Sequence, residues 1–252
     1  MRLTVSLLYH VITVVSLIFY VPLVLLTFPF PYVVRYGAAR HWGGFMVWVG
    51  KWLCGMDFVV EGKENIPHGA AIVMGKHQST WETFSFQQIF PPQVWVLKRE
   101  LLRIPLFGWA LALLDPIAID RGTGHQAVDQ IVEQGGERLQ SGRWVVVFPE
   151  GTRVPKGKRR KYGLGGAVLA AKTGYPVLPV AHNAGTYWPR RSARLYPGTI
   201  RVAIGPVIDP ENLTAEEIRD RAQDWIETKM MELENRSEPA ELIPIRYKGK
   251  SA

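Results

Sequence analysis

The sequence lacks the motifs that support several common classes of protein. Its 252 residues include one cysteine, Cys54, so no disulfide can form within the chain and a reducing compartment is expected. There is no C-x-x-C or H-E-x-x-H motif, which leaves a bound metal without support. There is also no G-x-S-x-G motif, so a hydrolase-type serine nucleophile is not indicated.

Charge is missing from the N-terminal stretch. Between Leu3 and Phe30 no side chain carries a full charge, and a helix of this length would measure about 40 Å against a hydrocarbon core of about 30 Å. We therefore expect a membrane-inserted helix. A cleaved signal peptide would be shorter and would end in a small-residue cleavage site. A buried helix of a soluble protein is the remaining alternative.

A second apolar stretch, residues 32–56, contains Arg35, Arg40 and Lys51. Its uncharged part is short, so residues 1–56 are expected to form a helical hairpin that is partly inserted and partly interfacial. These cations follow the first helix, which by the positive-inside rule places the rest of the chain on the cytoplasmic side of an inner, cytoplasmic membrane. The sequence leaves open whether the first helix crosses the bilayer or only dips into it.

The net charge is +8, which favours an anionic partner such as a membrane phospholipid surface, a phosphorylated substrate or a nucleic acid. The basic residues are dispersed and no nucleic-acid recognition motif is present, so we do not expect nucleic-acid binding.

From residue 57 onward short apolar runs alternate with helical patterns. The pattern predicts strands over residues 57–61, 70–75, 94–98, 116–120, 144–148, 177–181 and 199–204. It predicts helices over residues 79–89, 107–114, 124–140, 164–173 and 215–235. This alternation is typical of one α/β domain, residues 57–252, with a mixed, mostly parallel sheet flanked by helices.

A strand, a histidine and a helix start follow one another in residues 70–84, AAIVMGKHQSTWETF. Ser79 and Glu82 have the spacing of a capping box with Ser79 as N-cap. His77 and Glu82 form a His-x4-Glu pair, and only a strand-to-helix turn can bring these two side chains together. Such a pair at the carboxyl end of a strand lies where open α/β sheets bind ligands. A purely structural histidine, with Glu82 serving only as a cap, is the alternative.

A second run, VVVFPEGTR at residues 145–153, delivers Glu150, Gly151, Thr152 and Arg153 to the end of a strand. A guanidinium can bind a phosphate through two parallel hydrogen bonds, and a glycine lets backbone N–H groups approach it. The alternative is that this sequence forms an ordinary turn with a surface ion pair. The basic run at residues 156–161 is expected to face the membrane or solvent.

Two more runs are VLKRELLRIPLFGW at residues 96–109, where Lys98 ends a strand, and VLPVAHN at residues 177–183. Taken in order with KHQSTWE, IDRG at residues 119–122 and FPEGTR, they resemble the sequence blocks of the 1-acyl-sn-glycerol-3-phosphate (lysophosphatidic acid) acyltransferase family. The resemblance covers about residues 70–185. The family's first block is usually His-x4-Asp, and Glu82 replaces that aspartate here.

The resemblance implies a membrane-bound enzyme that moves a fatty acyl group from a thioester to the sn-2 hydroxyl of lysophosphatidic acid. His77 would be the general base and Glu82 would orient it. Glu150, Gly151, Thr152 and Arg153 would hold the glycerol phosphate head, with Lys98 and Arg121 as further phosphate contacts.

No cofactor is implied beyond the co-substrate, which is acyl-CoA or acyl carrier protein. Acylation of another lyso-lipid, such as a lyso-ornithine lipid, and non-catalytic binding to a lipid surface are the alternatives. The acyl chain length, the oligomeric state and the oxyanion donors are not specified by the sequence.

Overall fold

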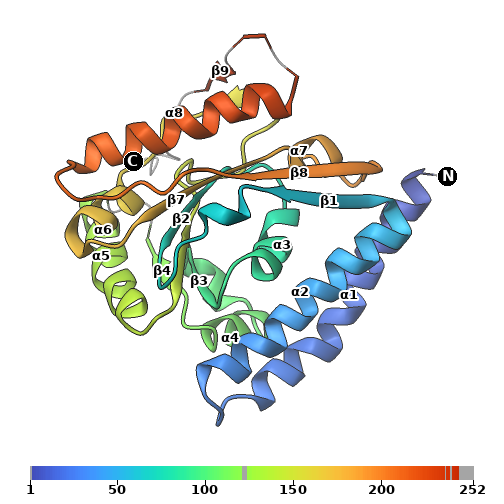
Figure 1. Cartoon of the computed structure of the whole chain (residues 1–252). Coiled ribbons are helices and arrows are strands. Elements are labelled where there is room, and N and C mark those ends of the chain that lie inside the picture. The colour runs from blue at the N-terminus through green and yellow to red at the C-terminus, as the bar shows by residue number, and fades with distance from the viewer. Residues whose placement is uncertain (1, 121–123, 236, 239, 244–252) are drawn as a thin grey trace, which may run out of the picture.

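A seven-stranded sheet forms the centre of the fold (Figure 1). The computed structural model describes residues 2–120, 124–235, 237–238 and 240–243. The strands of this sheet are β1 (Met56–Glu61), β2 (Ile72–Gly75), β3 (Gln93–Lys98), β4 (Ile117–Ile119), β5 (Trp144–Val147), β7 (Val177–His182) and β8 (Gly198–Ile204). Their order is β1-β8-β7-β2-β5-β3-β4. Neighbours are parallel except β7 and β8, so the expected mixed, mostly parallel sheet is confirmed.

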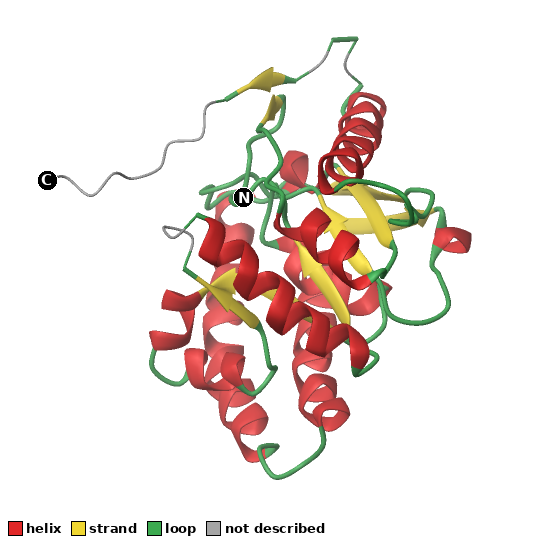
Figure 2. Ribbon diagram, turned by 90° about the vertical axis from the view of Figure 1, so that its left-hand side faces the viewer, coloured by secondary structure: helices red, strands yellow, loops and turns green. Residues whose placement is uncertain are grey.

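Helices cover both faces of the sheet (Figure 2). The chain begins with α1 (Arg2–Leu26) and α2 (Tyr32–Cys54). The remaining α-helices are α3 (Trp81–Ile89), α4 (Phe107–Ala112), α5 (His125–Gln140), α6 (Gly165–Thr173), α7 (Ala184–Tyr187) and α8 (Ala215–Leu233). Short 3-10 helices lie at η1 (Lys63–Asn65) and η2 (Arg99–Arg103), and a separate two-stranded ribbon pairs β6 (Lys158–Arg159) with β9 (Glu241–Leu242).

The alternation of side chains along β2 separates two apolar layers. Ile72 and Met74 pack on one side, in a cluster with buried residues of α5, α6 and α8. Ala71 and Val73 pack on the other side, together with Phe84 and Phe86 of α3. The sheet is therefore a central layer that is buried on both faces, which explains the almost continuous apolar runs of its inner strands.

The N-terminal hairpin is one of these covering layers. Tyr9 of α1 and Met46 and Val49 of α2 belong to the same buried cluster as the α3 side of the sheet. At Gly43 a Cβ atom would lie 3.2 Å from the backbone oxygen of Phe84, so glycine allows α2 to pack closely on α3. The hairpin and the α/β region thus share a core, and the division at residue 56 stays a prediction.

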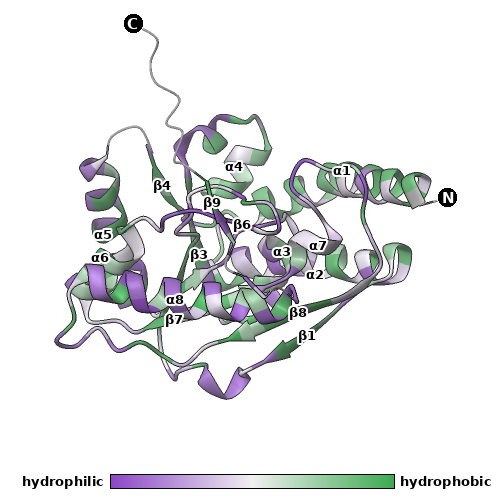
Figure 3. Cartoon of the chain, turned by 90° about the horizontal axis from the view of Figure 1, so that it is seen from above, coloured by the Kyte–Doolittle hydropathy of each residue, from purple (hydrophilic) through white to green (hydrophobic). Residues whose placement is uncertain are grey.

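The opposite side of α1 is bare. Leu3–Leu26 is long and apolar enough to cross a membrane, yet only 22% of its most apolar 18-residue segment is buried. In Figure 3 this helix is mainly green and white, at the edge of the molecule. Its exposed large apolar side chains are Leu3, Leu7, Leu8, Val11, Val14, Val15, Ile18, Phe19, Leu23 and Leu26.

The segment around η2 and α4 continues this bare surface. Leu101, Ile104, Leu106 and Trp109 are exposed, while Ala110 of α4 packs with Val21 and Val24 of α1. We call the exposed side chains of α1 and of residues 101–109 the apolar face.

Candidate active site

The candidate site lies at one edge of the sheet. The strand β2 lies between β7 and β5 and is parallel to both, so the carboxyl ends of these three strands meet at the same edge. His77 follows β2, Glu150 follows β5, and His182 is the last residue of β7. The topology therefore gathers residues that are far apart in the sequence.

His77 and Glu82 are in contact, as the His-x4-Glu spacing predicted. The chain turns between β2 and α3, and His77 Nδ1 lies 2.9 Å from Glu82 Oε1. A carboxylate can only accept a hydrogen bond, so Nδ1 carries the proton and Nε2 keeps its lone pair. His77 is partly exposed, with 17% of its side chain accessible, whereas Glu82 is fully buried. The pair thus presents a basic nitrogen backed by a buried anion.

The same carboxylate oxygen organises the start of α3. Glu82 Oε1 accepts the backbone N–H groups of Gln78 at 2.9 Å and Ser79 at 2.8 Å. The predicted N-cap was one residue early: α3 begins at Trp81 with Thr80 as N-cap, and Ser79 Oγ accepts from Trp81 N at 3.2 Å. Capping and orientation of the histidine are therefore not alternatives, because one oxygen does both.

The environment keeps Glu82 ionised and the ring of His77 in place. Burial alone would raise the pKa of Glu82, but His182, His77 and the Ser79 amide outweigh it, so the pKa lies below its ordinary value. The ring of His77 stacks on Phe148, with centroids 4.0 Å apart and planes at 9°. The imidazole is held by a hydrogen bond at one nitrogen and by an aromatic plane along its face.

His182 is unsuited to act as the base. Its Nε2 lies 2.8 Å from the backbone oxygen of Lys76, and its Nδ1 accepts the N–H of Ala184 at 3.3 Å. Burial lowers the pKa of this fully buried ring below its ordinary value, and both of its nitrogens are bound by the backbone, so its role is structural. The strand predicted over residues 177–181 agrees with this placement, because β7 ends at His182.

The loop after β5 binds both backbone groups of His77. The N–H of His77 donates to Glu150 Oε2 at 3.0 Å, and its C=O accepts the N–H of Val154 at 2.7 Å. Arg153 Nη1 donates to Thr80 Oγ1 at 2.7 Å. Arg153 and His77 therefore lie at the same place on the sheet edge, as the reading of the two blocks as one site required.

The other predicted phosphate-binding residues are placed differently from one another. Gly151 has a φ of 68°, a left-handed conformation suited to glycine, and a Cβ atom there would meet nothing within 4 Å. Thr152 and Arg153 are half-buried, and Lys98 is exposed at the end of β3. Arg121 lies outside the described residues.

Glu150 is not placed to touch a headgroup directly. Its side chain has no exposed surface, and its two oxygens bind Lys76 Nζ at 2.8 Å and the His77 N–H. Its carboxylate therefore holds the loop against His77.

Behind this contact lies a buried charge network that sequence reasoning missed. Lys76 Nζ also binds Glu227 Oε1 of α8 at 2.7 Å, and Tyr162 OH donates to the same oxygen at 3.1 Å. Burial raises the pKa of Glu150 to about 7 although Lys76 opposes this. For Lys76, burial alone would lower the pKa, but Glu150 and Glu227 more than offset it and the pKa is raised.

The sequence contains a signal for one member of this network but not for another. A lysine directly after the buried strand β2 could have suggested a buried partner, because an unpaired buried charge is costly. Nothing local points to Glu227, which is 151 residues away from Lys76 along the chain.

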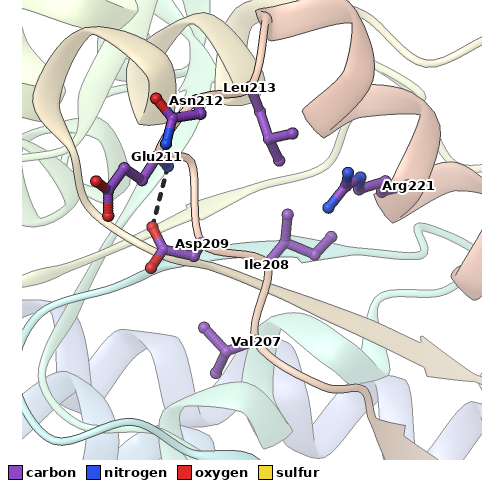
Figure 4. Close-up of a pocket in the computed structure, with 7 residues that line it drawn as sticks. All are labelled: Val207, Ile208, Asp209, Glu211, Asn212, Leu213 and Arg221. Carbon is purple, nitrogen blue, oxygen red and sulfur yellow. Dashed lines mark hydrogen bonds between the residues drawn. The ribbon is translucent and has the colours of Figure 1, made fainter.

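A surface hollow of about 510 Å³ lies elsewhere, lined by Val207, Ile208, Asp209, Glu211, Asn212, Leu213 and Arg221 (Figure 4). Ile208 pairs with Val177 at the start of β7, whereas the candidate site lies beyond the end of β7. The hollow is therefore at the opposite edge of the sheet and is not part of the site.

Comparison with known proteins gives the class and then the family. The profile of the acyltransferase family matches residues 57–183. The chain is 47% identical over 207 residues to the 1-acyl-sn-glycerol-3-phosphate acyltransferase of Pseudomonas aeruginosa, covering 81% of this chain and 80% of that protein. It is 31% identical to the protein of that name from Borreliella burgdorferi, covering 71% of this chain and 76% of that protein.

A solved structure agrees with this. The crystal structure of the 1-acyl-sn-glycerophosphate (LPA) acyltransferase from Thermotoga maritima matches with a TM-score of 0.78 at 27% identity, covering 94% of this chain and 98% of that chain. The chain therefore belongs to the 1-acyl-sn-glycerol-3-phosphate acyltransferase family.

The buried network makes a stability prediction. Replacing Lys76 with methionine leaves the buried Glu150 and Glu227 without a cation, which should lower the free energy of unfolding by about 3–5 kcal/mol at alkaline pH. Glu150 has its pKa raised from 4.5 to about 7 in the folded state. The folded chain therefore holds a proton that the unfolded chain releases, and stability falls as pH rises through this window. Without Lys76 this fall should be steeper.

Thermal unfolding of the detergent-solubilised protein, measured below and above pH 7, checks this. The exposed Lys172→Met on α6 is the matched control and should leave the midpoint unchanged. A loss of stability in Lys76→Met that is the same at both pH values would contradict the assignment.

Proposed function

We propose that this enzyme is a membrane-bound O-acyltransferase that moves a fatty acyl group from an acyl thioester to the sn-2 hydroxyl of lysophosphatidic acid, giving phosphatidic acid. The observation that carries the proposal is the contact between His77 Nδ1 and Glu82 Oε1, directly beside the Arg153 loop; it directs Nε2 of the neutral ring to serve as the acceptor. The relatives' shared name supports the choice of acceptor.

The chemistry follows from what the acceptor lacks. An alcohol is a poor nucleophile near neutral pH, whereas the thioester carbonyl is already activated. His77 Nε2 takes the hydroxyl proton as the oxygen attacks that carbonyl, and Glu82 stabilises the imidazolium that forms. The tetrahedral intermediate then collapses, the C–S bond breaks, and the thiolate takes the proton from His77. Because Cys54 is buried in α2, transfer is proposed to be direct, without an acyl-enzyme.

The phosphate of the acceptor is assigned to the loop after β5. Arg153 supplies the charge, while Gly151 and Thr152 shape the loop around it. Lys98, which is exposed at the end of β3, and Arg121 are proposed as further phosphate contacts, as the family resemblance implies. Glu150 acts through the backbone of His77 as a positioning residue. The donor is proposed to be acyl-CoA or acyl carrier protein.

The apolar face is proposed to dock on the cytoplasmic leaflet of the inner membrane. One side of α1 is bound to the protein: Ser6 Oγ accepts the N–H of Leu195 at 2.9 Å, and Tyr9 OH donates to Met46 O at 3.2 Å. The other side of α1 is exposed and belongs to the apolar face. A helix bound to the protein along one side and bare along the other suits insertion into one leaflet rather than a crossing.

Replacing His77 with alanine should lower kcat about 10²- to 10⁴-fold, because the proton acceptor is lost. The measurement is transfer of a labelled acyl group from a thioester to lysophosphatidic acid by purified protein in detergent. His125→Ala, at the start of α5, is the control and should keep wild-type activity. Wild-type turnover by His77→Ala would remove the general base from the mechanism.

Substitutions of Glu82 separate capping from catalysis. Glutamine can still accept the Gln78 and Ser79 N–H groups but carries no charge, so Glu82→Gln should keep much of the stability and lose much of kcat. Glu82→Asp keeps the charge on a shorter side chain and should retain substantial activity. Both quantities are measured, as kcat and as the thermal unfolding midpoint. If Glu82→Gln matches wild type in kcat, the carboxylate serves only as a cap.

The membrane assignment is tested on the apolar face. Ile18 and Phe19 are 65% and 69% exposed, and changing both to glutamate should weaken binding of the full chain to anionic vesicles at least about tenfold, because apolar contact is lost and like charge is added. Co-sedimentation measures this. Val59→Glu is the control, since Val59 is exposed on β1 and alternates with Phe58 and Val60, which pack in the hairpin layer. Equal binding by the double variant and the control would contradict the docking.

A further inference from the structure

A group of arginines surrounds the candidate phosphate site, and the sequence blocks account for only Arg153. Arg160 and Arg190 are half-buried, like Arg153, and Arg191 is exposed. Arg190 and Arg191 lie on the loop that follows α7, outside all the blocks.

Hydrogen bonds place two segments at the site: α7, which leads into this loop, and the segment that carries Arg160. Gly185 N donates to Gln78 Oε1 at 3.2 Å, and Gln78 is the residue after His77. Arg160 Nη1 donates to the backbone oxygen of Glu150 at 3.1 Å, which places it against the loop that binds His77. The loop after α7 and the loop after β5 therefore converge on the same sheet edge from two sides.

The guanidinium groups are close enough to affect each other. Burial, and then the charges of Arg191, Arg153 and Arg160, lower the pKa of Arg190. None of these four arginines forms an ion pair with a carboxylate among the residues that the structure describes. Like charges held together without a counterion oppose folding, so the arrangement calls for a multivalent anion from outside the chain.

We propose that Arg190 completes an anion cradle with Arg153 and Arg160, which binds the dianionic phosphate monoester of the acceptor and selects it over lyso-lipids without that group. A phosphate monoester carries a charge of about −1.5 to −2 at pH 7, and each guanidinium offers a two-pronged donor. Three guanidiniums from two loops match such a group better than Arg153 alone. The proposal rests on the proposed function and adds to it the residue that sets headgroup selectivity.

The same ligand chemistry also occurs in the acyl donor, because coenzyme A carries phosphate groups. The cradle is assigned to the acceptor because the loop with Arg153 binds the backbone of the base itself. The acceptor hydroxyl must reach that base while its phosphate is only a few bonds away.

Steady-state kinetics of the full-length protein in detergent tests the proposal. Arg190→Ala should raise KM for lysophosphatidic acid about 10- to 100-fold, as expected for loss of a charge-assisted contact, with little change in kcat or in KM for the acyl thioester. Arg190→Lys should have a KM for lysophosphatidic acid between those of wild type and Arg190→Ala. Arg194→Ala is the matched control, since Arg194 is exposed on the same loop and its charge is not among those acting on Arg190; it should stay close to wild type.

A pH series adds a readout that a merely structural role would not change. The second pKa of the phosphate headgroup is about 6. The ratio of the Arg190→Ala and wild-type KM values should therefore shrink as the pH is lowered and the phosphate becomes a monoanion. A constant ratio, or a rise in KM for acyl-CoA instead of the acceptor, overturns the assignment.

Binding of glycerol 3-phosphate, followed by thermal shift, separates failure of the cradle from failure of the function. Stabilisation of wild type that is lost in Arg190→Ala supports the cradle even if lysophosphatidic acid is not acylated. Acylation by wild type with equal KM values for Arg190→Ala and Arg194→Ala keeps the function and rejects the cradle.

Discussion

The backbone of His77 is bound on both of its polar groups by one loop, and the site depends on this contact. The N–H is held by Glu150 and the C=O by Val154, so the imidazole and the arginine between these two residues cannot shift independently. The contact exists because β2 and β5 are parallel neighbours. Behind this contact the buried Lys76 binds both Glu150 and Glu227.

The sheet was largely accessible from local sequence, because each of its strands is a short apolar run bounded by turn residues. All seven predicted strands lie within two residues of the observed bounds. The order of the strands was not accessible, since β8 pairs with β1 across 140 residues in the contact between Arg201 and Glu61. The ribbon of β6 and β9 and the one-turn helix α7 are too short to leave a periodic pattern.

The site divides in the same way. His77 and Arg153 follow strand ends, Glu82 lies in the first turn of α3, and all three carry a recognisable chemistry, so residue type and spacing were enough to propose them. Glu150 shows the limit of that reasoning: a carboxylate beside a phosphate loop suggested direct contact, and only the packing reveals that it faces Lys76. Glu227 and Arg190 come from elements far along the chain, and their relation to His77 arises only when the sheet is assembled.

A lipid acceptor sets a stricter condition than a soluble one, because its headgroup depth, its phosphate and its hydroxyl are fixed relative to one another. The structure meets this with direct contacts rather than a linker. The helix α7, which leads into the loop that carries Arg190, is bound to the site through Gly185 and Gln78, and the loop is bound to α1 through Leu195 and Ser6. If α1 sets the depth of the protein in the leaflet, the same few hydrogen bonds set the depth of the proposed cradle and of the base beside it. The hairpin is then part of the geometry of the site, which accounts for its burial in the core of the sheet.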